Sequence, residues 1–124
     1  LTVYTALCAL QNQAPRLATP EAVTAAAADS GDALATEAVE IFCAALGSLA
    51  GNLAMAFMAT GGVYLAGGFL SSMFALLERS AFEERFLHGR SARALLSQVP
   101  VWVTEHGRHG VLGAARWYLG RLAA

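Results

Sequence analysis

The feature that most constrains this chain is the run from Ile41 to Leu77, which contains no Asp, Glu, Lys or Arg. A helix that crosses a bilayer needs about 20 apolar residues, so this run is long enough to form one. Gly47 and Gly51 also have the small-residue spacing that lets two membrane helices approach closely. A membrane span is therefore one interpretation of the run.

Internal glycines argue against that interpretation. Asn52 and two glycine pairs, Gly61–Gly62 and Gly67–Gly68, interrupt the run. Each glycine in a helix interior costs about 1 kcal/mol relative to Ala, and doubled glycines usually mark a turn. The borders of the run lack the Trp and Tyr residues and the basic excess that flank membrane helices. We therefore expect a soluble protein without a membrane partner.

A soluble helix accounts for the first half of the run. Asp32 can cap a helix that begins at Ala33 and continues past Phe57. Because its second half is apolar all round, we expect that half to be buried on every side. Gly47 and Gly51 lie one turn apart, so another element can approach the helix backbone there.

The second half of the run predicts a strand followed by a tight turn. Val63–Ala66 has the length and β-branched composition of a buried strand, and Gly67–Gly68 follows its carboxyl end. Leu70–Leu77 then resumes helical spacing. A ligand at such a turn can touch the backbone, because glycine has no Cβ. The sequence predicts a helix-rich α/β fold with a ligand-ready turn.

The other elements follow from cap and turn residues. They are expected to be helices at Leu1–Leu10, Pro20–Ala28, Ala81–His88 (capped by Ser80), Ser91–Ser97 and Val111–Ala123, a strand at Val99–Val103, and a loop at His106–Gly110.

Composition excludes several functions. Hydrophobic residues make up 56% of the 124 residues, so one core can form and disorder is disfavoured. The net charge of −1 lacks the basic excess of a nucleic-acid-binding protein. There is no Lys, which removes Schiff-base chemistry. Cys8 and Cys43 have neither zinc-site nor disulfide-framework spacing, so we expect reduced thiols in the cytoplasm.

Two other groups of residues invite a functional reading that we do not favour. His106 and His109 lie three apart in a glycine-rich loop, but no third ligand is nearby, so we expect no metal site. Glu37 and Glu40 could be taken for paired catalytic carboxylates. In the first turns of a helix they are better read as a solvated face that complements the helix dipole.

Five ordered segments resemble a known family. EAVEIFCAALGSLAGNLA, ATGGVYLAGGF, FEERF, QVPVWVTEH and GVLGAA are similar, in order and spacing, to the bacterial glucokinases. These are ATP-dependent hexose kinases of the actin-like, ribonuclease-H-like fold. The resemblance spans residues 1–124 and implies the carboxyl-terminal portion of the large lobe, as a partial domain. The absence of Met at position 1 agrees with a piece of a longer protein.

The resemblance also implies a site and a reaction. It places the adenosine-binding turn at Ala66, Gly67, Gly68 and Phe69. The parent enzyme would transfer the γ-phosphoryl group of ATP to glucose with Mg²⁺, whereas the catalytic and sugar-binding residues would lie upstream of Leu1. We therefore expect no catalytic residue in this segment, and an inactive fragment.

Two departures from the family pattern limit the resemblance. Leu70 follows Phe69 where the family commonly has Pro-Arg, and His109–Gly110 stands where the family has Pro-Gly. The alternatives that stay open are a non-catalytic helical module that self-associates, as a homodimer, and a small membrane protein.

Overall fold

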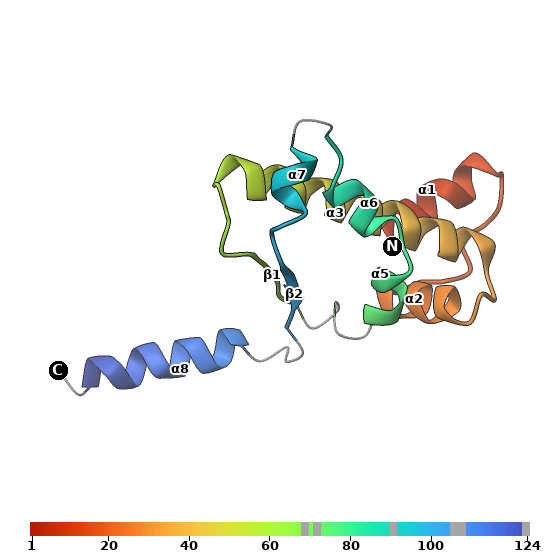
Figure 1. Cartoon of the computed structure of the whole chain (residues 1–124). Coiled ribbons are helices and arrows are strands. Elements are labelled where there is room, and N and C mark those ends of the chain that lie inside the picture. Colours follow the sequence, from red (N-terminus) through yellow and green to blue (C-terminus); the bar gives the residue numbers. More distant parts are fainter. Residues whose placement is uncertain (68–69, 71–72, 90–91, 105–108, 123–124) are drawn as a thin grey trace.

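The computed structural model describes residues 1–67, 70, 73–89, 92–104 and 109–122. Figure 1 shows a helical body that carries a short strand pair, with the last helix extending away from it. The elements are α1 (Thr2–Leu10), α2 (Pro20–Ala28), α3 (Ala33–Ala56), β1 (Val63–Leu65), α5 (Phe74–Glu78), α6 (Phe82–Phe86), α7 (Arg93–Leu96), β2 (Val101–Val103) and α8 (His109–Leu122).

Helix α3 is the centre of the body, and α1, α2 and α6 pack against it. It begins as predicted, because the Oδ1 atom of Asp32 accepts a hydrogen bond from the backbone N–H of Ala35 at 3.0 Å. Its buried face contacts Tyr4 and Cys8 of α1 and Val23 of α2 within one apolar core. Burial of these side chains is the main source of stability for such short helices.

The predicted close approach at Gly47 and Gly51 is confirmed. A Cβ atom added at Gly47 would collide with the backbone of Phe82, and one added at Gly51 would collide with the backbone of Phe86. Both partners belong to α6, so the two glycines form the surface on which α6 lies. Asn52, next to Gly51, is exposed and makes no side-chain hydrogen bond within the described part of the chain.

The start of α6 depends on two polar side chains. The backbone N–H of Ala81 donates to the Oε2 atom of Glu40 at 3.3 Å, and the N–H of Phe82 donates to the Oγ atom of Ser80 at 3.2 Å. The predicted helix of residues 81–88 is thus shortened to Phe82–Phe86. The reading of Glu40 as purely solvated was wrong, because its carboxylate satisfies a backbone donor of α6.

The two strands form a parallel pair, with Val63 opposite Val101, Tyr64 opposite Trp102 and Leu65 opposite Val103. Each strand is shorter than predicted, since β1 ends at Leu65 and β2 begins at Val101. The prediction of a helix-rich α/β fold is confirmed for the described residues.

The prediction that the second half of α3 is buried on every side was wrong. Leu49 is 55% exposed, Leu53 46% and Phe57 77%. The physical reason is that α6 covers only the glycine face, and no element among the described residues covers the apolar residues of the opposite side. By length and composition alone, α3 could also cross a bilayer, but in this structure α1, α2 and α6 pack against it.

The shorter helices differ from their predicted bounds. Of the helix predicted at residues 70–77, the structure describes α5, from Phe74 to Glu78, and before it the N–H of Met73 donates to the carbonyl of Leu70 at 3.3 Å. Helix α7 spans Arg93–Leu96 in place of residues 91–97. Four- and five-residue helices have few internal hydrogen bonds, so sequence periodicity defines their ends poorly.

Helix α8 begins at His109, inside the predicted loop, and it does not pack as a closing helix. Every one of its residues from Gly110 to Arg121 is exposed. Its apolar residues Val111, Leu112, Ala115, Tyr118 and Leu119 fall on one side at helical spacing. The prediction of an amphipathic helix is confirmed, but in this structure its apolar side lies open to solvent.

Candidate functional site

The carboxyl ends of the two strands form one edge of the sheet. Ala66 and Gly67 follow β1 at this edge, and both are exposed. Thr104 follows β2, where its N–H donates to the carbonyl oxygen of Leu65 at 2.9 Å and its Oγ1 donates to the same oxygen at 3.3 Å. Thr104 therefore fixes the point at which β1 turns away, a role that the sequence did not indicate.

The turn after β1 has an accessible backbone. The N–H of Leu70 donates to the carbonyl of Gly67 at 3.0 Å, which closes the turn. A Cβ atom added at Gly67 would meet only the Cδ1 atom of Leu70, at 3.9 Å. Packing within the described residues therefore does not require glycine at position 67, and among these residues its backbone is accessible. Gly68 and Phe69, the other two predicted site residues, lie outside the described residues.

The glycine pair at the opposite end of β1 has a different role. Gly62 has a φ of 117°, and a Cβ there would collide with the Trp102 ring. That ring stacks on Tyr64 with centroids 4.7 Å apart and an interplanar angle of 23°. The two aromatic rings lie on one side of the sheet and are largely exposed, Tyr64 at 67% and Trp102 at 41%. Packing therefore requires glycine at position 62, whereas no contact among the described residues requires it at position 67.

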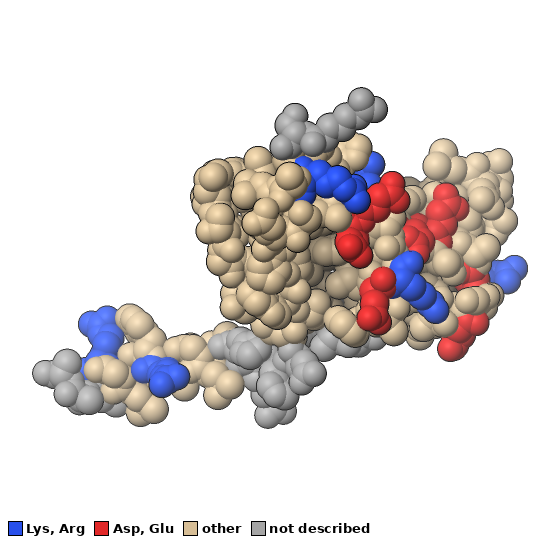
Figure 2. Space-filling model, viewed as in Figure 1, with Lys and Arg blue, Asp and Glu red and all other residues tan. Residues whose placement is uncertain are grey.

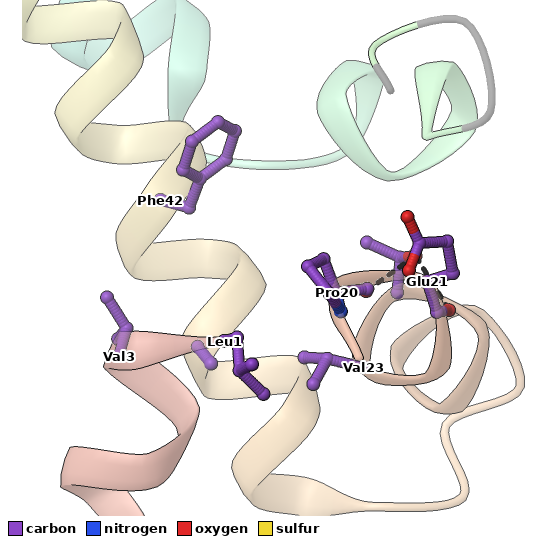
Figure 3. Close-up of a pocket in the computed structure, with 8 residues that line it drawn as sticks. Leu1, Val3, Pro20, Glu21, Val23 and Phe42 are labelled. Atoms are coloured by element: carbon purple, nitrogen blue, oxygen red, sulfur yellow. Dashed lines mark hydrogen bonds between the residues drawn. The ribbon is translucent and has the colours of Figure 1, made fainter. Parts of the chain in front are cut away.

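An apolar recess of about 380 Å³ opens between α1, α2 and α3 (Figure 3). Leu1, Val3, Val23 and Phe42 line it. The hydroxyl of Thr24, which also lines it, donates to the carbonyls of Pro20 and Glu21 at 3.2 and 3.0 Å. The Thr24 hydroxyl is thus bound to its own helix, and the recess is mostly apolar, with the Glu21 side chain as its charged lining group.

Two titratable side chains, those of Tyr4 and Cys43, are buried in the apolar core. Burial and the neighbouring Cys8 thiol raise the pKa of Tyr4, whose hydroxyl donates to Asp32 at 3.3 Å. Burial raises the pKa of the Cys43 thiol as well. Both cysteines are free thiols, as predicted. A raised pKa keeps these groups protonated and neutral, which suits a core and not a nucleophile.

No group of three or more His, Cys, Asp or Glu residues could hold a metal ion within the described ranges. Of the two histidines considered from the sequence, His106 lies outside the described residues and His109 is the first residue of α8.

These features define the class of the protein. It is a helix-rich α/β protein that offers an open turn at the carboxyl ends of parallel strands, the edge at which α/β proteins usually bind ligands. The sequence model of the glucokinase family matches residues 1–120. The chain belongs to the glucokinase family.

Individual relatives agree with this assignment. A glucokinase-like protein of Xylella fastidiosa (strain Temecula1 / ATCC 700964) is 50% identical over 99% of this chain, and a glucokinase of Marinobacter nauticus is 41% identical over 93%. The crystal structure of a glucokinase from an Antarctic psychrotroph covers 84% of this chain with 31% identity and a TM-score of 0.74. The chain spans only 37%, 36% and 33% of the lengths of these three proteins.

Proposed function

We propose that this chain supplies the adenosine-binding turn of a glucokinase and part of the packing of its large lobe. The turn would comprise Ala66 and Gly67 together with Gly68 and Phe69. The single observation that carries the proposal is the open Gly67, exposed at the carboxyl edge of a parallel strand pair in a member of the glucokinase family. Backbone groups at such an edge can contact a nucleotide without obstruction by a Cβ.

The parent reaction is the transfer of the γ-phosphoryl group of ATP to the 6-hydroxyl of glucose. Mg²⁺ would neutralise phosphate charge in this reaction, and positioning would supply most of the catalysis. The described residues include no group of three or more possible metal ligands. We propose that the base and the sugar ligands belong to the larger part of a full-length relative, and that residues 1–124 alone form an inactive partial domain.

The proposed placement is the carboxyl-terminal portion of the large lobe of a ribonuclease-H-like, actin-like fold, in a cytoplasmic enzyme. The sheet supports this placement. Parallel sheets are usually covered on both faces, but one face here presents the exposed Tyr64–Trp102 stack. The exposed side of α3 bears Leu49, Leu53 and Phe57. A larger fold would bury both surfaces.

The proposal is tested by titrating the 124-residue chain with ATP and Mg²⁺ while recording backbone amide shifts. We expect saturable shifts at Ala66 and Gly67, and their loss in Gly67→Val. Gly61→Val is the matched control, because Gly61 is exposed and a Cβ there meets nothing within 4 Å. Equal ATP affinity in Gly67→Val and the unmodified chain would exclude this turn as the adenosine site.

A second candidate is a self-associating module, and the exposed apolar side chains favour it. The part of the body where α3 ends and β1 begins is uncharged in the view of Figure 2, while charged side chains gather elsewhere. In isolation the chain would reduce this exposure by forming a homodimer. Sedimentation equilibrium decides: a concentration-independent monomer mass would exclude the homodimer.

A further inference from the structure

A second recess, unrelated to the strand edge, lies between α3, α6 and α7. It has a volume of about 290 Å³ and is lined by Ser48, Gly51, Asn52, Met55, Arg85, Phe86, His88, Ala92 and Leu96. Helix α7 leads into the amino end of β2, and the strands are parallel. The recess is therefore on the side of the amino ends of the strands, whereas Gly67 follows their carboxyl ends (Figure 1).

The inner wall of the recess is apolar and fixed. Gly51, Phe86 and Leu96 are buried there. Because a Cβ at Gly51 would collide with the Phe86 backbone, the backbones of α3 and α6 are close-packed here only because residue 51 is glycine. The distance between the two helices, and with it the width of the recess, is thus set by backbone contact.

The rim of the recess is polar, and one side chain on it is held in place. The Nε–H of Arg85 donates to the Oγ atom of Ser48 at 3.2 Å, and the Ser48 hydroxyl donates in turn to the carbonyl of Ala44 at 3.0 Å. Ser48 therefore uses its hydrogen and one lone pair to orient the guanidinium. The two terminal amino groups of Arg85 have no hydrogen-bond or ion-pair partner among the described residues.

Asn52 and His88 add further polar groups to this rim. Both are exposed, and the side chain of neither is hydrogen-bonded within the part of the chain that the structure describes. His88 also lines an adjoining recess of about 430 Å³ together with Glu84, Leu87, Gly89 and Arg93. Across both recesses the described charged residues are two arginines and one glutamate, so positive charge prevails.

We propose that this recess binds the phosphate group of a small molecule. The planar guanidinium of Arg85 would hold the oxyanion through its terminal amino groups, with the Asn52 amide as a second donor. Met55, Phe86 and Leu96 would contact a short apolar substituent. The site is separate from the adenosine turn, and it does not depend on the proposed kinase function.

The test is a titration of the 124-residue chain with inorganic phosphate at constant ionic strength. Binding is monitored through the chemical shifts of the backbone amides and of the Arg Nε–H groups. We expect saturable shifts at Ser48, Asn52, Arg85 and His88, and at least tenfold weaker binding in Arg85→Gln. Arg79→Gln is the matched control, because Arg79 is also exposed and lies outside both recesses, and it should bind phosphate as the unmodified chain does.

A second variant guards against a general loss of structure. Asn52 is exposed and unbonded within the described residues, so Asn52→Leu should fold normally while binding phosphate several-fold more weakly. Propyl phosphate distinguishes the ligands: tighter binding than inorganic phosphate indicates a phosphate monoester with an apolar substituent, and weaker binding indicates free phosphate. Equal shifts with chloride, or equal affinities in Arg85→Gln and Arg79→Gln, would overturn the proposal.

Discussion

Helices α6 and α8 differ in a way that their lengths would not suggest. Helix α6 has five residues, yet Phe82 and Phe86 are buried and its backbone touches α3. Helix α8 has fourteen residues, yet each of its residues from 110 to 121 is exposed. The comparison shows that complementary surfaces, and not helix length, decide which segments this chain holds in its body.

The residues of the two contacts explain the difference. Glycines at positions 47 and 51 of α3 provide a concave surface into which α6 fits. The Glu40 carboxylate accepts a hydrogen bond from the backbone N–H of Ala81, the residue directly before α6. Helix α8 has its own apolar side, but its glycines at 113 and 120 face open space. A helix of this length is marginal in water by itself, so α8 is the element that depends most on a surface outside the described body.

The largest effect should come from filling the concave surface. We expect Gly47→Ala to reduce the free energy of unfolding by about 2–3 kcal/mol, because the new Cβ collides with the carbonyl oxygen of Phe82 and a backbone atom cannot move aside cheaply. Urea denaturation followed by far-UV circular dichroism measures the change. A loss below about 0.5 kcal/mol would mean that α6 is as loosely attached as α8.

The next largest effect concerns the helix on which α6 lies. Asp32→Ala removes the N-cap bond to Ala35 and the acceptor of the Tyr4 hydroxyl, so we expect a loss of about 1–2 kcal/mol. Asp29→Ala is the matched control, since Asp29 is exposed and its side chain makes no hydrogen bond within the described residues. Equal effects of the two variants on the urea midpoint would exclude a special role for Asp32.

The sequence predicted the elements that depend on local signals. The Asp32 cap, the close approach at Gly47 and Gly51, and the strand–turn order around Gly67 all follow from residue type and spacing, and the structure agrees. The family was also recognisable from ordered segments. Ligand contact at Ala66–Phe69 stays a prediction, because the structure contains no ligand and describes only the first two of these residues.

What the sequence did not predict depends on tertiary contacts. Glu40 bonds to Ala81, Ser48 orients Arg85, and Thr104 bonds to Leu65, each across some 37 to 41 positions. No local pattern contains these pairs. The exposure of Leu49, Leu53 and Phe57 was missed for the opposite reason, since an apolar pattern indicates that a surface favours burial but not that this chain supplies the cover.

A smaller change sharpens the comparison from the α8 side. Gly113→Ala is the same substitution as Gly47→Ala, but a Cβ at Gly113 meets nothing within 4 Å. We expect the helix to gain about 1 kcal/mol through the higher propensity of Ala, with the unfolding midpoint of the body unchanged. By circular dichroism, Gly113→Ala should therefore raise the helical signal at an unchanged unfolding midpoint, whereas Gly47→Ala should lower the midpoint. A destabilised body in Gly113→Ala would show that α8 packs against it in solution.

The smallest effect should come from a side-chain pair within α8. The guanidinium of Arg121 lies 4.9 Å from the ring centroid of Trp117, an exposed cation–π contact. We expect Arg121→Ala to cost the last turn about 0.5 kcal/mol, seen as faster amide exchange near Trp117. Arg116→Ala, on the same helix with the same charge change, is the control. If both variants speed exchange equally, the charge of the arginines stabilises α8 and the ring contact adds nothing. If only Arg121→Ala speeds exchange, the contact between Arg121 and Trp117 itself stabilises the last turn.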